Sequence, residues 1–131
     1  MYSFNLPDNW YRWMPTAHHN DENVFELIDR FVSYKSPDYL AVRLPKLFYL
    51  WGHAYEFDEK NNWDRMEEIC KKISNKEDTW YATNIEIYDY VKAYERLQTS
   101  YDKTIIHNPS AIDVWVMVKG ETYCIKAGDT I

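Results

Sequence analysis

Apolar and polar positions along the first half of the chain predict a helix, a strand and a second helix. After a polar stretch with acidic residues that suit a helix N-terminus, the first helix is predicted by Val24, Leu27, Ile28 and Phe31, which have helical spacing. Residues 47–51 form a continuous apolar run, which is typical of a strand covered on both faces. The second helix is expected to open at 58–62 and to carry Trp63, Met66, Ile69, Cys70 and Ile73 on one face.

The second half of the chain changes from helical to strand-like patterning. Residues 80–82 read as a short strand, and the sequence from Thr83 to Glu86 has the Thr-x-x-Glu form of a capping box that opens a third helix. From residue 100 onward the pattern is of short strands, at 104–107, 112–118 and 121–126, with a turn at Lys119 and Gly120. An antiparallel β-hairpin is therefore expected at the C-terminal end.

Alternating strands and helices indicate an α/β fold. The 131 residues suffice for one domain, with an α/β portion over 1–99 and a β-hairpin extension over 100–131. Hydrophobic residues make up 46% of the sequence and can supply a core.

Charge and composition exclude several classes of protein. The formal net charge is −6 and no cluster of basic residues occurs, so a nucleic-acid partner is not expected. No apolar segment approaches the roughly 20 residues that span a bilayer, and the first residues do not resemble a secretion signal. The two cysteines, Cys70 and Cys124, lie far apart and outside any metal-binding spacing. We therefore expect a cytoplasmic protein with reduced thiols and no membrane partner.

His53 is the first candidate for chemistry, because it follows Gly52 directly after the apolar run 47–51. Catalytic groups commonly sit at the C-terminal ends of strands in α/β folds. An imidazole titrates close to neutral pH, so it can both hold and release a proton. Two interpretations remain open at this point: a proton donor, or a core histidine hydrogen-bonded to the backbone.

The residues around His53 also resemble a known family. The sequence Leu-Phe-Tyr-Leu-Trp-Gly-His-Ala-Tyr-Glu-Phe at 47–57 is similar to the last signature motif of the polysaccharide deacetylases, carbohydrate esterase family 4. Residues 15–21, 80–90 and the closing β segment resemble bacterial members of that family in the same order. The resemblance covers only the C-terminal part of the family's domain and implies a partial (β/α) barrel with a C-terminal antiparallel β-hairpin.

The resemblance is incomplete in a way that bears on activity. Family members hold a divalent, zinc-like metal through one Asp and two His and use a second Asp as base, but this sequence has no Asp-Asp pair and no His-x-x-x-His spacing. No cofactor is therefore expected on this chain alone. We expect a deacetylase-like protein that is inactive in isolation, oligomeric, and completed by an N-terminal deacetylase half or by self-association. The alternative is a non-catalytic carbohydrate-binding or interaction module.

The resemblance gives His53 the role of general acid. Glu56 either supports the imidazolium of His53 or is a solvated loop carboxylate. Trp13, Tyr55 and Trp63 are expected to stack on a sugar ring, because aromatic faces suit that contact, while Trp51 and Trp80 are expected in the core.

The cluster of His18, His19, Asp21 and Glu22 offers a further set of polar side chains. Imidazole and carboxylate groups are zinc ligands, but adjacent side chains usually diverge, so helix-entry contacts are the favoured interpretation. His107, on a predicted strand, is expected to be structural.

Overall fold

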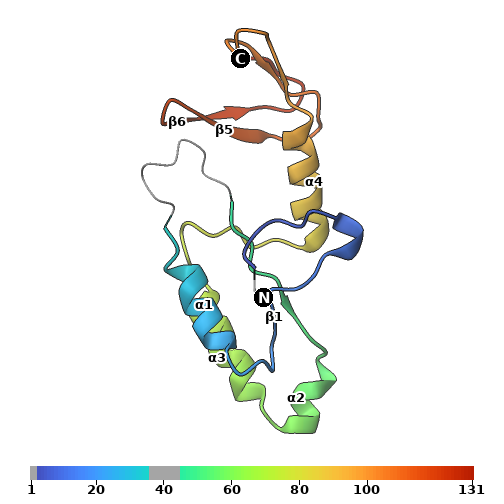
Figure 1. Cartoon of the computed structure of the whole chain (residues 1–131), viewed down its shortest axis with the longest axis vertical. Helices are drawn as coiled ribbons and strands as arrows, with labels where there is room; N and C mark the ends of the chain where they lie inside the picture. Colours follow the sequence, from blue (N-terminus) through green and yellow to red (C-terminus); the bar gives the residue numbers. More distant parts are fainter. Residues whose placement is uncertain (1–2, 36–44) are drawn as a thin grey trace. The chain divides into compact units, whose positions relative to one another are not determined.

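The computed structural model describes residues 3–35 and 45–131, which fold as two compact units (Figure 1). Unit 1 spans Met1–Thr79 and unit 2 spans Trp80–Ile131. The sequence predicted the boundary between an α/β portion and a β-hairpin extension at residue 99, whereas the first compact unit ends at Thr79. The reason is the helix after Thr79, which packs against the C-terminal strands and so belongs with them.

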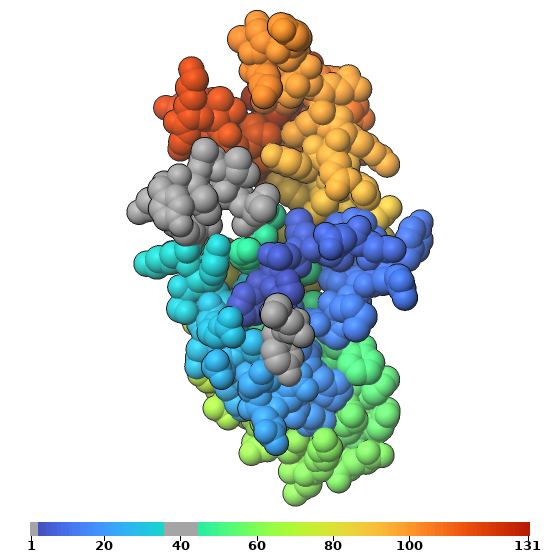
Figure 2. Space-filling model, viewed as in Figure 1, coloured from blue at the N-terminus to red at the C-terminus, as the bar shows by residue number. Residues whose placement is uncertain are grey.

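Unit 1 holds most of the helices. Its elements are the 3-10 helix η1 (Trp10–Arg12), β1 (Ala17–His18), α1 (Val24–Val32), β2 (Leu50–Trp51), α2 (Tyr55–Lys60) and α3 (Trp63–Ile73). The predicted apolar face of α1 is confirmed, since Val24, Leu27 and Ile28 are buried. They form a core with Ala17 of β1 and Ile69 of α3. Figure 2 shows the blue and cyan residues of the N-terminal segment and α1 packed beside green residues near α2.

The predicted strand over 47–51 is shorter than its apolar run. Only β2 pairs with a neighbour, parallel to β1, with Ala17 opposite Leu50 and His18 opposite Trp51. An extended segment forms a strand only where its backbone is hydrogen-bonded to a neighbouring strand. Among the described residues, β1 is the one partner of β2. Leu47, at the start of this run, is nevertheless hydrogen-bonded, because its N–H donates to Phe4 O at 2.7 Å.

The second predicted helix is divided in two. Residues 58–60 belong to α2, and Asn61 ends that helix in the left-handed conformation, with φ of 47°. Asparagine tolerates this conformation better than most residues, so it can terminate one helix and let α3 begin two residues later. The helix over Trp63–Ile73 is confirmed, and the preceding turn was missed.

Unit 2 contains one helix and two small sheets. Its elements are α4 (Asn84–Glu95), β3 (Gln98–Thr99), β4 (Ile106–His107), β5 (Val114–Val118) and β6 (Glu121–Ile125). The predicted hairpin is present, because β5 and β6 pair antiparallel across the turn at Lys119 and Gly120. The predicted C-terminal antiparallel hairpin is therefore confirmed.

The start of unit 2 differs in part from the prediction. The predicted helix opens as its capping-box sequence requires, since the Glu86 carboxylate accepts from the Thr83 N–H at 2.7 Å and from its hydroxyl at 2.6 Å. Residues 80–82, predicted as a strand, have no regular structure. Trp80 is 59% exposed rather than in the core, and its ring meets Tyr90 of α4 edge-on. The apolar run at 80–82 therefore leads into the helix without pairing.

Candidate functional site

Three histidines gather at one edge of the parallel pair β1 and β2. The two strands run in the same direction, so the residues that follow His18 and Trp51 leave at the same edge. The His19 N–H donates to Trp51 O at 2.9 Å and holds the two chains together there. Gly52 and His53 come next, so the predicted placement of His53 just after a strand end is confirmed. His53 is exposed, which excludes the interpretation as a core histidine.

The His53 ring lies between two aromatic side chains. It stacks on Tyr55 with ring centroids 5.1 Å apart and an angle of 19°, and it meets Trp51 at 5.1 Å with an angle of 66°. Trp51 was expected in the core, but it is 44% exposed. All three residues are exposed, so they offer solvent an aromatic surface with the His53 imidazole in it.

Glu56, in the first turn of α2, organises the site differently from either prediction. Its Oε2 accepts from the backbone N–H of His53 at 3.0 Å, and it lies 2.8 Å from Nε2 of His19 and 3.2 Å from Nε2 of His18. The pKa of Glu56 is lowered, mainly by the hydrogen bond from the His53 N–H; desolvation opposes this shift, and smaller contributions from His19 and His18 add to it. Glu56 thus supports the backbone of His53, and its carboxylate joins the other two histidines.

His18 and His19 meet through their rings as well as through Glu56. Their centroids lie 4.3 Å apart, and His19 stacks on Phe57 at 4.2 Å. Nδ1 of His18 accepts from the Asn20 N–H at 3.1 Å, so its proton is on Nε2 and points to Glu56. His19 is 3% exposed, and none of the described residues gives its Nδ1 a hydrogen-bond partner. The neighbouring Asp21 plays another role, since its carboxylate accepts from the His18 N–H at 2.9 Å and so caps the turn; Glu22 is exposed.

The expected sugar-stacking residues are not all in one place. Trp63 packs on Phe57 with centroids 5.0 Å apart and donates its Nε1–H to Asp58 at 2.7 Å, so it extends the ring contacts of His19. Trp13 instead packs on Tyr49, with centroids 5.2 Å apart, and on Trp10. Tyr55 and Trp63 therefore flank the histidines, and Trp13 contributes to a separate aromatic group. The predicted structural role of His107 agrees with its bond to the Thr130 hydroxyl at 2.9 Å.

Arg65 of α3 fixes the loop that carries His19. Its Nε donates to His19 O at 2.7 Å and its Nη2 donates to Asp21 O at 2.6 Å, while the guanidinium lies 4.9 Å from the Phe25 ring centre. No motif in the sequence pointed to Arg65. Its place in a helix gave no sign that it bonds to a loop more than 40 residues earlier.

We expect Arg65→Ala to lower the free energy of unfolding of unit 1 by about 2–3 kcal/mol, because two charge-assisted hydrogen bonds to main-chain oxygens are lost. Chemical denaturation of the variant measures this loss. Lys71→Ala is the control, since Lys71 is an exposed basic residue of the same helix whose ion pair with Glu67 is solvent-exposed. Equal stability of the two variants would contradict the role given to Arg65.

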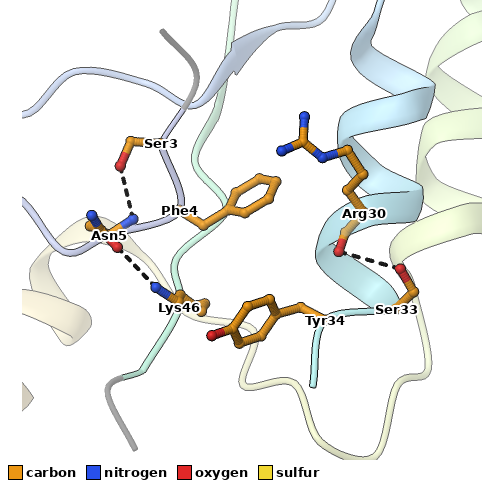
Figure 3. Close-up of a pocket in the computed structure, with 7 residues that line it drawn as sticks. All are labelled: Ser3, Phe4, Asn5, Arg30, Ser33, Tyr34 and Lys46. Carbon is orange, nitrogen blue, oxygen red and sulfur yellow. Dashed lines mark hydrogen bonds between the residues drawn. The ribbon is translucent and has the colours of Figure 1, made fainter. Parts of the chain in front are cut away.

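A cavity lies elsewhere in unit 1 (Figure 3). This cavity of about 520 Å³ is lined by Ser3, Phe4, Asn5, Arg30, Ser33, Tyr34 and Lys46. Its polar wall is tied by the Lys46 ammonium, which donates to the Asn5 side chain at 2.9 Å. Among the described residues no histidine or carboxylate lines it, so this lining offers no group for acid-base catalysis. The candidate site is therefore the histidine edge of β1 and β2.

Comparison with known proteins adds no assignment. The chain matches no protein-family model, no curated protein and no solved structure. Among the described residues, no helix has the length and apolar character needed to cross a membrane. Function is therefore argued from the site itself.

Proposed function

We propose that this chain is the C-terminal part of a polysaccharide deacetylase-like domain, in which His53 is the general acid. The observation that carries the proposal is the placement of an exposed imidazole just beyond the end of a parallel strand, stacked on Tyr55 and anchored through its backbone to Glu56. This is the position at which α/β enzymes hold catalytic groups.

The short parallel pair supports the view that the domain is completed by other strands. Parallel strands are normally found in larger sheets whose two faces are covered, and a pair of two-residue strands buries little. Among the described residues, β1 and β2 have no further strand neighbours. An N-terminal deacetylase half, or a second copy of this chain, would pair with such an edge, and for this reason we propose an oligomer or a two-part complex.

The proposed reaction is the hydrolysis of an acetyl group on a carbohydrate. Water adds to the acetyl carbonyl and gives up a proton to the base on the completing polypeptide; the bond from carbon to nitrogen then breaks, the imidazolium of His53 donates a proton to the leaving amine, and acetate is the other product. A divalent metal held by the completing polypeptide would activate the water. Tyr55 and Trp63 are 57% and 48% exposed, and we propose that they stack on sugar rings.

Acetate release from N-acetylated chito-oligosaccharides tests this proposal. We expect no release by the chain alone. We expect release when it is mixed with an N-terminal deacetylase segment carrying the Asp-Asp and His-x-x-x-His motifs. His53→Ala should lower that rate by about 10²- to 10⁴-fold, as expected for loss of a general acid. His107→Ala is the matched histidine control and should leave the rate unchanged. Equal rates from the His53 variant and the unchanged chain would refute the role of His53.

A non-catalytic carbohydrate-binding module is the second candidate, favoured by the exposed rings of Trp51, Tyr55 and Trp63. Tryptophan fluorescence during titration with the same sugars separates the two functions. A response that His53→Ala leaves intact, together with no acetate release in the mixture, would favour binding without chemistry.

A further inference from the structure

The cluster of His18, His19 and Glu56 has the composition of a transition-metal site. One nitrogen from each histidine and one carboxylate oxygen all lie within 4.8 Å of one another. Two imidazoles and one carboxylate form a common catalytic zinc ligand set, and imidazole favours zinc and its neighbours over magnesium or calcium. The sequence suggested Asp21 and Glu22 as the acidic members. The structure supplies Glu56 from α2 instead.

We propose that His18, His19 and Glu56 bind one zinc-class divalent ion through the two Nε2 atoms and Oε2. With ligands about 2.0–2.1 Å from a tetrahedral ion, neighbouring ligand atoms lie about 3.4 Å apart. The two nitrogens lie 3.2 and 2.8 Å from Oε2, so small side-chain rotations open the space that the ion needs. The site is separate from the ligand motifs of the deacetylase family, and it does not depend on the proposed function.

The surroundings of the cluster fix His19 and leave one side open. His19 is held by the stacking of Phe57, by the Arg65 bond to its carbonyl and by the close approach of Gly52. His18 and Glu56 are partly exposed, so solvent can reach the cluster from their side. Three protein ligands with an open position allow a water molecule to complete the coordination.

Metal binding has a cost that sets the expected affinity. Each imidazole must carry its proton on Nδ1 when Nε2 binds the ion. For His18 this disrupts the bond from the Asn20 N–H, and for His19 it places an N–H in a buried position where no described acceptor lies. Metal-bound histidines normally donate that proton to an acceptor, and losing one such bond weakens binding about 10- to 100-fold. We therefore expect a dissociation constant of about 1 µM, rather than the much tighter binding of fully supported zinc sites.

Zinc binding to the full chain tests the proposal, with a chromophoric zinc indicator as competitor. We expect one zinc per chain, and Co²⁺ in its place should give the visible absorption of a four-coordinate site. Glu56→Gln keeps the side-chain volume, and His18→Ala removes a partly exposed ring; each should weaken zinc binding at least about 10-fold. His107→Ala, which removes a histidine from unit 2, should bind zinc like the unchanged chain.

Two results would overturn the proposal. One is the absence of stoichiometric binding at about 100 µM free zinc, a hundred times the expected dissociation constant. The other is binding that both Glu56→Gln and His18→Ala leave within twofold of the unchanged chain. Circular dichroism of each variant shows whether it is folded, and the Co²⁺ spectrum of the unchanged chain tests the site without any substitution. Since acetate release is not the readout, these results do not depend on the proposed function.

Discussion

Replacing Gly52 by alanine is expected to unfold much of unit 1. A Cβ at this position would lie 1.8 Å from Cδ2 and 2.3 Å from Nε2 of His19, and the φ of +151° is one that residues with side chains rarely adopt. His19 is buried against Phe57 and its loop is held by Arg65, so it cannot move aside without loss of both contacts. Backbone strain and overpacking each cost about 1–3 kcal/mol, and together they consume a large part of a small domain's stability.

Amide hydrogen exchange measures this effect unit by unit. In Gly52→Ala we expect faster exchange throughout α1 and α3, while β5 and β6 of unit 2 exchange as in the unchanged chain. Gly120→Ala is the control, because it also has positive φ, at +88°, but a Cβ there meets nothing within 4 Å. Normal protection of α1 and α3 in the Gly52 variant would show that His19 does not occupy the position described.

Replacing Asn108 is expected to have a comparably large effect on unit 2. This side chain is completely buried, and its Nδ2 donates to the carbonyls of Ile112, Ile125 and Lys126 at 2.8, 3.0 and 3.2 Å. Its Oδ1 accepts from the N–H and hydroxyl of Ser110. Asn108→Ala removes all of these bonds; the Ile112 and Lys126 carbonyls keep the Ser110 hydroxyl and the Asp129 N–H as donors, but the buried bond to the Ile125 carbonyl is lost, at about 1–3 kcal/mol for a group left unsatisfied. Asn108→Asp should be worse, because it sets a carboxylate against carbonyl oxygens.

The same exchange experiment tests Asn108 with the roles of the units reversed. We expect the amides of β5 and β6 to lose protection and those of α1 and α3 to keep it. Asn84→Ala, at an exposed position at the start of α4, should change stability by no more than about 0.5 kcal/mol. Similar behaviour of the Asn84 and Asn108 variants would contradict the bonding scheme.

Local patterns predicted the elements whose signals are local. The apolar spacing of α1, the capping box of α4 and the turn of the β5–β6 hairpin each depend on residues within a few positions of one another. Strand length could not be predicted in this way, because a strand also needs a partner. The apolar runs at 47–51 and 80–82 look alike in sequence, yet only Leu50–Trp51 has a described partner.

The candidate site was predicted in part for the same reason. The position of His53 follows from its place after an apolar run and a glycine, which is a local signal. The meeting of Glu56 with His18 and His19 depends on the parallel register of β1 and β2, and no spacing in the sequence encodes it. Gly52 carried the one available hint, since a glycine between a strand and a histidine is typical of a close approach by another chain segment.

One titration tests most directly whether the histidine edge is a carbohydrate site. N-acetylchitotetraose is added to the chain, and NMR monitors the signals of its histidine and aromatic side chains. The account predicts that the signals of His53, Tyr55 and Trp63 shift together and saturate, while Trp115 on the hairpin stays unchanged. Shifts confined to unit 2 or to the cavity at Phe4 and Tyr34, or no shifts at millimolar sugar, would contradict it.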